Sequence, residues 1–241
     1  MLRGINRGVT MKRALLSLVF AGTALVSQAQ ESVLEKVWVT APTEEGFQKL
    51  NTRVDRLVTK VGRRHYRTDT RKLYALFMKT HERFLHSYVQ YSGIEDLATG
   101  NYDCLTATSL FADILTKSGY QFKIIETNYH IFIMVNTKDG DVLLETTDRL
   151  GGFINDKVKM NSMVAEYQKN LLASATASHY RYSFNLYRTI TTDQLAGLLF
   201  FNQAVNAFNS ERWTECSEKL TAASRSTNSP RIAELAELLP E

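Results

Sequence analysis

The stretch that decides the fold is residues 101–153, NYDCLTATSLFADILTKSGYQFKIIETNYHIFIMVNTKDGDVLLETTDRLGGF. It places a cysteine at the start of a helical pattern, a histidine at the head of an apolar strand pattern, and an acid at the end of the next strand pattern. A thiol nucleophile, its general base and the group that orients the base are made of these three side-chain types. Predictions of both fold and function therefore start here.

The helical pattern covers residues 104–118, with Asp103 as a good N-cap and Gly119 as the stop. Cys104 heads the apolar stripe of this helix, so we expect its thiol to point into the domain. A helix N-terminus favours thiolate over thiol. The carboxylate of Asp103 opposes this effect, so we expect a base to be required as well. The alternative is a buried structural cysteine.

Three strand patterns follow, at residues 122–126, 129–135 and 142–146. The Asp139-Gly140 turn signal makes the last two a hairpin. Side chains alternate along a strand, so His130 should share its face with Phe132 and not with Ile131.

The acid that would face His130 depends on the register of this hairpin. A tight turn at residues 139–140 would pair His130 with about Asp148, whereas a turn centred on residues 137–138 would pair it with Glu145. The spacing leaves both acids open.

The rest of the chain is predicted to be mostly helical. Helical patterns occur at residues 44–61, 69–91, 156–168, 193–209, 211–226 and 230–239, and an aromatic strand pattern runs over residues 180–186. His81 and His86, inside the second helix, are expected to be solvated.

Cys216 lies at a position of the C-terminal helices that requires a small buried side chain, so we expect it in the core. If the protein is exported to an oxidising compartment, as the N-terminal segment below predicts, a Cys104–Cys216 disulfide is the alternative.

The N-terminal segment predicts export. Basic Lys12-Arg13 precedes an apolar run at residues 14–26, and Ser27 and Ala29 stand at the −3 and −1 positions of a cleavage site. We expect a signal peptide cleaved near Ala29 and a mature protein in the periplasm or outside the cell. The run is shorter than the roughly 20 residues that span a bilayer, so no stable membrane anchor is expected after cleavage.

The charge of the chain gives no reason to expect a nucleic-acid partner. The formal net charge is +4, from 29 basic and 25 acidic residues. Four of the basic residues lie within the predicted leader, so the mature chain has 25 of each sign. The sequence contains no glycine-rich phosphate loop and no cluster with the spacing of zinc ligands, so we expect neither a cofactor nor a metal.

The central stretch resembles the transglutaminase-like (papain-like cysteine) superfamily. That family has a cysteine opening a helix, a glycine ending it, a strand with His-aromatic-apolar character, and a strand ending in Asp-Pro-Thr. Here the corresponding residues are Tyr102-Asp103-Cys104, Gly119, His130-Ile131-Phe132 and Glu145-Thr146-Thr147. The match covers about fifty residues, and it departs from the family in having glutamate for aspartate and Phe132 where a tryptophan is common.

The resemblance implies thiolate attack on an amide and a thioester intermediate, with Cys104 as nucleophile, His130 as base and Glu145 as the orienting acid. Asp148 is the alternative acid. An oxyanion hole would use the backbone N–H of Cys104, with Gln90, Tyr88 or Tyr102 as the second donor or a groove residue.

We therefore predict an α+β protein with a papain/transglutaminase-like core and a small all-helical C-terminal extension. Its parts are a signal peptide at 1–29, a transglutaminase-like domain at 30–190, and a tetratricopeptide-like helical extension at 191–241. The predicted function is an exported thiol-dependent hydrolase or acyltransferase acting on peptide or protein amides. The alternative is an inactive module of the same fold that binds a protein or peptide. The sequence does not distinguish hydrolysis from transamidation, and it does not indicate the oligomeric state.

Overall fold

The computed structural model describes residues 32–128, 130–177 and 186–240. The predicted signal peptide lies outside these residues. None of the helices in the described ranges is long and apolar enough to cross a membrane.

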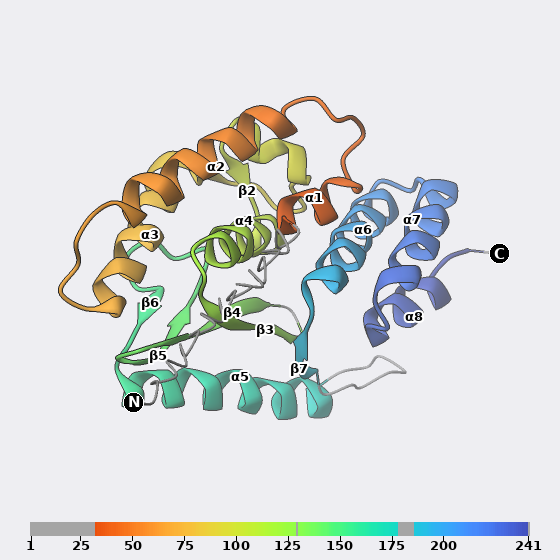
Figure 1. Ribbon diagram of the computed structural model, residues 1–241. Helices are drawn as coiled ribbons and strands as arrows, with labels where there is room; N and C mark the ends of the chain where they lie inside the picture. The colour runs from red at the N-terminus through yellow and green to blue at the C-terminus, as the bar shows by residue number, and fades with distance from the viewer. Residues whose placement is uncertain (1–31, 129, 178–185, 241) are drawn as a thin grey trace, which may run out of the picture.

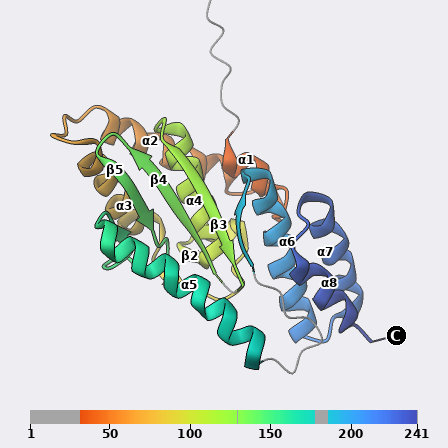
Figure 2. The same ribbon diagram turned by 90° about the horizontal axis from the view of Figure 1, so that it is seen from below.

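A five-stranded antiparallel sheet with strand order β6-β5-β4-β3-β7 forms the centre of the fold. Its strands are β3 (Gln121–Thr127), β4 (Ile131–Thr137), β5 (Gly140–Leu144), β6 (Phe153–Ile154) and β7 (Tyr187–Ile190). Helix α4 (Cys104–Lys117) packs on one face of this sheet, and α5 (Lys157–Ala177) runs across the other face (Figures 1 and 2). The predicted α+β class is confirmed.

The remaining elements surround α4 or follow the sheet. Before α4 come α1 (Val33–Trp38), α2 (Phe47–Gly62), α3 (Asp69–Phe84), β1 (Ser87–Tyr88), the 3-10 helix η1 (Ile94–Ala98) and β2 (Asn101–Tyr102). After β7 come α6 (Thr192–Asn209), α7 (Trp213–Ser226) and α8 (Pro230–Glu237). Helix α4 is buried on nearly every side because the sheet covers one face while α1, α2, α3 and α6 pack on the others.

The predicted start of α4 is confirmed, and a reciprocal cap fixes it. The Asp103 carboxylate accepts a hydrogen bond from the Thr106 backbone N–H at 2.8 Å. The Thr106 hydroxyl in turn accepts one from the Asp103 backbone N–H, also at 2.8 Å. Two backbone donors that the first helical turn leaves unpaired are thereby satisfied. The cap sets the position of Cys104, the first residue of the helix.

The predicted alternation along β4 is also confirmed. Ile131 and Ile133 belong to the main core on the α4 side. Phe132 belongs to a second apolar cluster with Met160 of α5. His130 directly precedes the strand, and by the same alternation its side chain lies on the α5 side of the sheet.

The hairpin of β4 and β5 is confirmed, but neither predicted register is right. Thr137 pairs with Gly140, so the turn residues are Lys138 and Asp139. A tertiary contact selects this turn, because the Asp139 carboxylate accepts hydrogen bonds from the backbone N–H of Thr70 at 2.7 Å and from its hydroxyl at 3.0 Å. Asp139 thus caps the first turn of α3, which the sequence spacing alone does not reveal.

Two predicted helix boundaries are wrong. The helix predicted for residues 69–91 ends at Phe84, because Leu85 is extended and the next residues pair with the chain before α4. The Val89 N–H donates to the Tyr102 carbonyl at 2.8 Å in this pairing. The helix predicted for residues 156–168 continues to Ala177. Most of the strand predicted for 180–186 lies outside the described residues, and β7 begins at Tyr187.

His81 is buried, contrary to the prediction that it is solvated. The residue is 2% exposed, and its ring packs against the rings of Phe77 and Phe111 with centroid distances of 4.7 and 5.5 Å. It shares the inner face of α3 with Phe77, one helical turn earlier. Burial, and then the charge of Arg149, lower the pKa of His81 from its usual 6.5 to about 4, against an opposing effect of Asp148.

We expect the free energy of unfolding to fall between pH 7 and pH 4 because of His81. Between its two pKa values the unfolded chain binds a proton that the folded chain does not, so stability is lost as the pH falls from 6.5 toward 4. The loss should reach roughly 3 kcal/mol, since each unit of pKa difference is worth about 1.4 kcal/mol. Urea unfolding at several pH values, compared with His81→Leu, measures it. An equally steep fall in the variant would contradict this assignment.

The C-terminal helices pack on the main core. Leu195, Leu198 and Leu199 of α6 belong to that core. The second half of α6 forms a separate cluster with α7 and α8. Cys216 is fully buried in this cluster, as predicted, and both it and Cys104 are free thiols. The α6–α7 pair is therefore anchored to the sheet domain through the first turns of α6.

Candidate functional site

A cavity of about 440 Å³ lies where the N-terminus of α4, the chain entering β4, and helices α6 and α8 meet. Its lining includes Tyr88, Gln90, Cys104, His130, Asn202 and Arg231. Four residues singled out from the sequence therefore line one space. Tyr102, also singled out, is buried and packs edge-on against the ring of Tyr88 with centroids 5.8 Å apart.

His130 and Glu145 form the most specific polar contact at this cavity. Nε2 of His130 is hydrogen-bonded to Oε2 of Glu145, and the glutamate side chain is only 8% exposed. The other carboxylate oxygen accepts hydrogen bonds from Thr147, at 2.9 Å from the hydroxyl and 3.4 Å from the backbone N–H. Since Glu145 occupies Nε2, Nδ1 is the ring nitrogen that can accept a proton from a substrate or a thiol.

The surroundings of Glu145 keep it ionised. Its burial would raise the pKa of the carboxyl group, but the hydrogen bond and charge of His130 outweigh this, helped by Thr147, and the pKa lies below its usual value. An ionised carboxylate fixes the orientation of the imidazole ring and stabilises the imidazolium form.

The loop from Glu145 to Gly152 holds the carboxylate in place. The Glu145 N–H donates to the Gly152 carbonyl at 2.8 Å, and the Gly152 N–H donates to the Asp148 carbonyl at 2.9 Å. A Cβ at position 152 would lie 2.2 Å from the Glu145 carbonyl oxygen, so this closure requires glycine. The Asp148 carboxylate is used inside the loop, where it accepts the N–H groups of Leu150 and Gly151 at 3.0 and 2.9 Å. Of the two acids considered from the sequence, Glu145 is the one bonded to His130.

Tyr167 of α5 is a member of this site that the sequence does not reveal. Its hydroxyl donates to Oε2 of Glu145 at 3.1 Å. Its ring stacks on His130, with centroids 5.6 Å apart, and on Phe132, with centroids 5.1 Å apart. One side chain therefore contacts both members of the His130–Glu145 pair. A tyrosine in a helix carries no sequence signal for such a role, because the contact arises only when α5 crosses the sheet.

The thiol of Cys104 is neutral at physiological pH. Its burial, and then the negative charge of Asp103, raise its pKa to about 12, while the positive charge of Arg231 acts in the opposite direction. The expected benefit of the helix N-terminus is thus outweighed. A thiolate would form only if the proton passed to a base at the moment of reaction, and His130 lines the same cavity.

Donors for a developing negative charge are present beside Cys104. The backbone N–H at the first position of α4 has no partner within the helix. Gln90 and Tyr88 line the cavity with it. Partial desolvation raises the pKa of Tyr88 and the negative charge of Asp103 raises it further, so its hydroxyl keeps its proton as a hydrogen-bond donor.

The wall contributed by the C-terminal helices is the main feature that the sequence does not predict. Phe201 and Asn202 of α6 and Arg231 and Leu235 of α8 line the cavity together with Cys104. Asn202 also donates to the Asp103 carboxylate at 2.8 Å, which ties α6 to the cap of α4. These residues follow Cys104 by about 100 to 130 positions, and no local pattern relates them to it.

Within the described ranges, no group of three or more histidine, cysteine and acidic side chains is arranged to hold a metal ion. The chemistry available at the cavity is that of a thiol, an imidazole held by a carboxylate, and nearby hydrogen-bond donors. No protein-family model, curated protein or solved structure matches this chain significantly.

Proposed function

We propose that this protein is an exported thiol-dependent hydrolase or acyltransferase that acts on peptide-type amides. Cys104 is the nucleophile, His130 the general base and Glu145 the residue that orients it. The observation that carries the proposal is the His130–Glu145 pair at the edge of a cavity that also contains Cys104 at a helix N-terminus. The cysteine-bearing helix packed on an antiparallel sheet agrees with a papain/transglutaminase-like core. Export to the periplasm or the medium rests on the N-terminal sequence.

The proposed reaction begins with transfer of the Cys104 thiol proton to Nδ1 of His130 as sulfur attacks the carbonyl carbon of the amide. The carbonyl oxygen becomes an oxyanion beside the backbone N–H of Cys104. The C–N bond then breaks while His130 returns the proton to the leaving amine, which leaves a thioester on Cys104. Water or a second amine attacks this thioester and regenerates the thiol, and these two acceptors distinguish hydrolysis from acyl transfer.

The raised pKa of Cys104 sets the type of mechanism. A thiol with a pKa of about 12 is not a preformed thiolate, so His130 must act as a base in the transition state. The ionised Glu145 offsets the cost of forming imidazolium in a half-buried place. The apolar side chains of Phe201, Val205 and Leu235, which also line the cavity, suit a substrate with an apolar group near the reacting carbonyl.

The test is the rate of Cys104 alkylation by iodoacetamide against pH, in a Cys216→Ala background. We expect His130→Ala to lower the rate at pH 7 by about 10²-fold or more, the usual contribution of a general base. The parent protein and His130→Ala should also differ in the shape of their pH profiles. Equal rates and pH profiles in the two proteins would refute the proposal.

A second candidate is an inactive module that binds a protein or peptide in the same cavity. The observation that favours it is the half-buried Cys104 thiol beside the Asp103 carboxylate, an environment that raises the pKa of the thiol and makes it a poor nucleophile. It predicts slow alkylation that follows a single high pKa and does not depend on His130. The alkylation experiment therefore separates the two candidates.

A further inference from the structure

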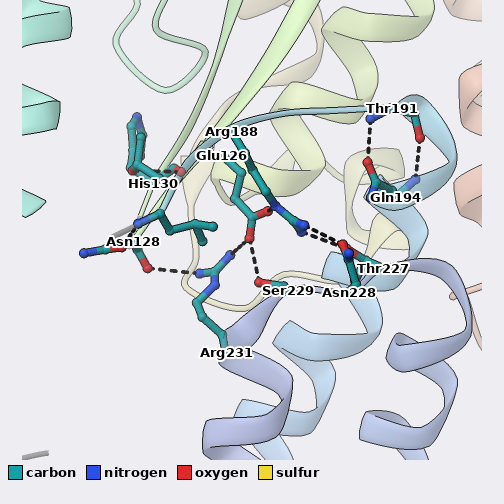
Figure 3. Close-up of polar contacts among 12 residues, drawn as sticks. Glu126, Asn128, His130, Arg188, Thr191, Gln194, Thr227, Asn228, Ser229 and Arg231 are labelled. Carbon is teal, nitrogen blue, oxygen red and sulfur yellow. Dashed lines mark hydrogen bonds and ion pairs between the residues drawn. The ribbon is translucent and has the colours of Figure 1, made fainter. Parts of the chain in front are cut away.

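A buried ionic network joins the sheet to the C-terminal helices, and Glu126 of β3 is its centre (Figure 3). The Glu126 carboxylate is fully buried. It accepts hydrogen bonds from Nε of Arg188 at 2.8 Å, from Nη2 of Arg231 at 2.7 Å and from the Ser229 hydroxyl at 3.0 Å. Arg188 comes from β7, whereas Ser229 and Arg231 come from the start of α8. The network therefore fixes α8 against the end of the sheet.

The two arginines differ in what else they contact. Nη1 of Arg188 donates to the Asn228 side chain at 2.6 Å and Nη2 to the Thr227 hydroxyl at 3.0 Å, both in the α7–α8 connection. Arg231 instead turns toward the cavity. It lines the cavity together with Cys104 and His130, and its guanidinium lies 5.1 Å from the centroid of the Phe201 ring. Of the two arginines, Arg231 is therefore the one that connects the network to the candidate site.

Arg231 also contacts the connection that carries His130. Its Nη1 donates to the Asn128 carbonyl oxygen at 3.4 Å, in the chain between β3 and β4 (Figure 3). At the ends of this connection, the Thr127 N–H and hydroxyl both donate to the His130 carbonyl, at 2.8 and 3.1 Å. Arg231 therefore binds the end of β3 and the residue that follows the strand, through the Glu126 carboxylate and the Asn128 carbonyl, and Asn128 is two positions before His130.

We propose that Arg231 is a positioning residue for His130, acting through the β3–β4 connection, so that helix α8 completes the candidate site. This inference rests on the function proposed above. Because the arginine side chain is a rigid planar fork, it can hold a carboxylate and a carbonyl group at the same time. The histidine is then restrained from both sides, by Glu145 and Tyr167 on its ring and by the Arg231-bound backbone before it.

The charge of Arg231 has a second effect in the same direction. Burial and Asp103 raise the pKa of Cys104, and Arg231 is the positive charge that opposes them. Loss of Arg231 would therefore both loosen the position of the base and make the thiol harder to deprotonate.

Arg188 provides the matched control. In a Cys216→Ala background, Arg231→Met and Arg188→Met each remove one guanidinium from Glu126 and keep much of the apolar stem. We expect both variants to unfold at a lower temperature. Only Arg231→Met should slow Cys104 alkylation by iodoacetamide at pH 7, by about 10- to 100-fold, the cost of a small misplacement of a reacting group. Its pH profile should also approach that of His130→Ala, while Arg188→Met keeps the profile of the parent.

Arg231→Lys separates position from charge. Lysine keeps the positive charge but presents a single ammonium group. Compared with Arg231→Met, Arg231→Lys should therefore recover less than half of the lost alkylation rate on a logarithmic scale. Full recovery with lysine, an unchanged rate and profile in Arg231→Met, or equal losses in both methionine variants would each overturn the positioning role. If His130→Ala itself leaves the alkylation profile unchanged, the proposed function fails, and this result is distinct from any outcome at Arg231.

Discussion

Glu145→Gln is expected to slow the acylation of Cys104 by about 100-fold or more, with little change in the free energy of unfolding. The glutamine side chain fills the same space but carries no charge to stabilise imidazolium, and its amide can hold the ring in the wrong tautomer. Glu145 is buried with its pKa below the usual value, so the carboxylate is ionised across the pH range in which a histidine titrates. Mass spectrometry of the protein mixed with p-nitrophenyl acetate would measure the acylation rate.

Two variants control for the specificity of this effect. Asp148→Asn keeps the oxygen that accepts the Leu150 and Gly151 N–H groups, so the loop and the acylation rate should both be retained. Tyr167→Phe keeps the stacking on His130 and loses only the hydroxyl that donates to Glu145. Its rate should fall by roughly 3- to 10-fold, in keeping with about 1 kcal/mol for one hydrogen bond. An Asp148→Asn variant as slow as Glu145→Gln would contradict the assignment of the acid.

The local patterns of residues 101–153 predict the helix, the strands and the hairpin, because each depends on neighbours along the chain. The Asp103 cap and the alternation of β4 are local in this sense. The choice between Glu145 and Asp148 cannot be made from local patterns. It depends on a turn at Lys138-Asp139, which the contact between Asp139 and Thr70 selects.

The parts that the sequence does not predict depend on contacts between distant segments. Tyr167 reaches Glu145 only because α5 crosses the sheet, and Arg231 lines the cavity only because α8 docks on β3. The burial of His81 has a similar origin, since its ring packs against Phe111 of α4 as well as against Phe77 of its own helix. A histidine or tyrosine between charged neighbours is typical of a solvated helix face until a packing partner is known.

The largest effect on stability is expected from Glu126→Ala, which should lower the free energy of unfolding by about 3–5 kcal/mol. The substitution leaves the guanidinium groups of Arg188 and Arg231 without their shared carboxylate in a place that water does not reach freely. Breaking a buried ion pair by removing one partner costs this much because the remaining charge stays desolvated. Urea unfolding followed by circular dichroism measures the loss.

Glu215→Ala is the matched control, because Arg212 and Glu215 form an ion pair of similar length, 2.7 Å, on the surface. Their side chains are 47% and 42% exposed, so water and salt screen the interaction, and the loss should be below about 1 kcal/mol. The double variant Glu126→Ala/Arg231→Met should be more stable than Glu126→Ala alone, because it removes one of the two uncompensated charges. A Glu126→Ala protein as stable as Glu215→Ala would show that the network does not hold α8 against the sheet, and the structural basis for the role of Arg231 would be lost with it.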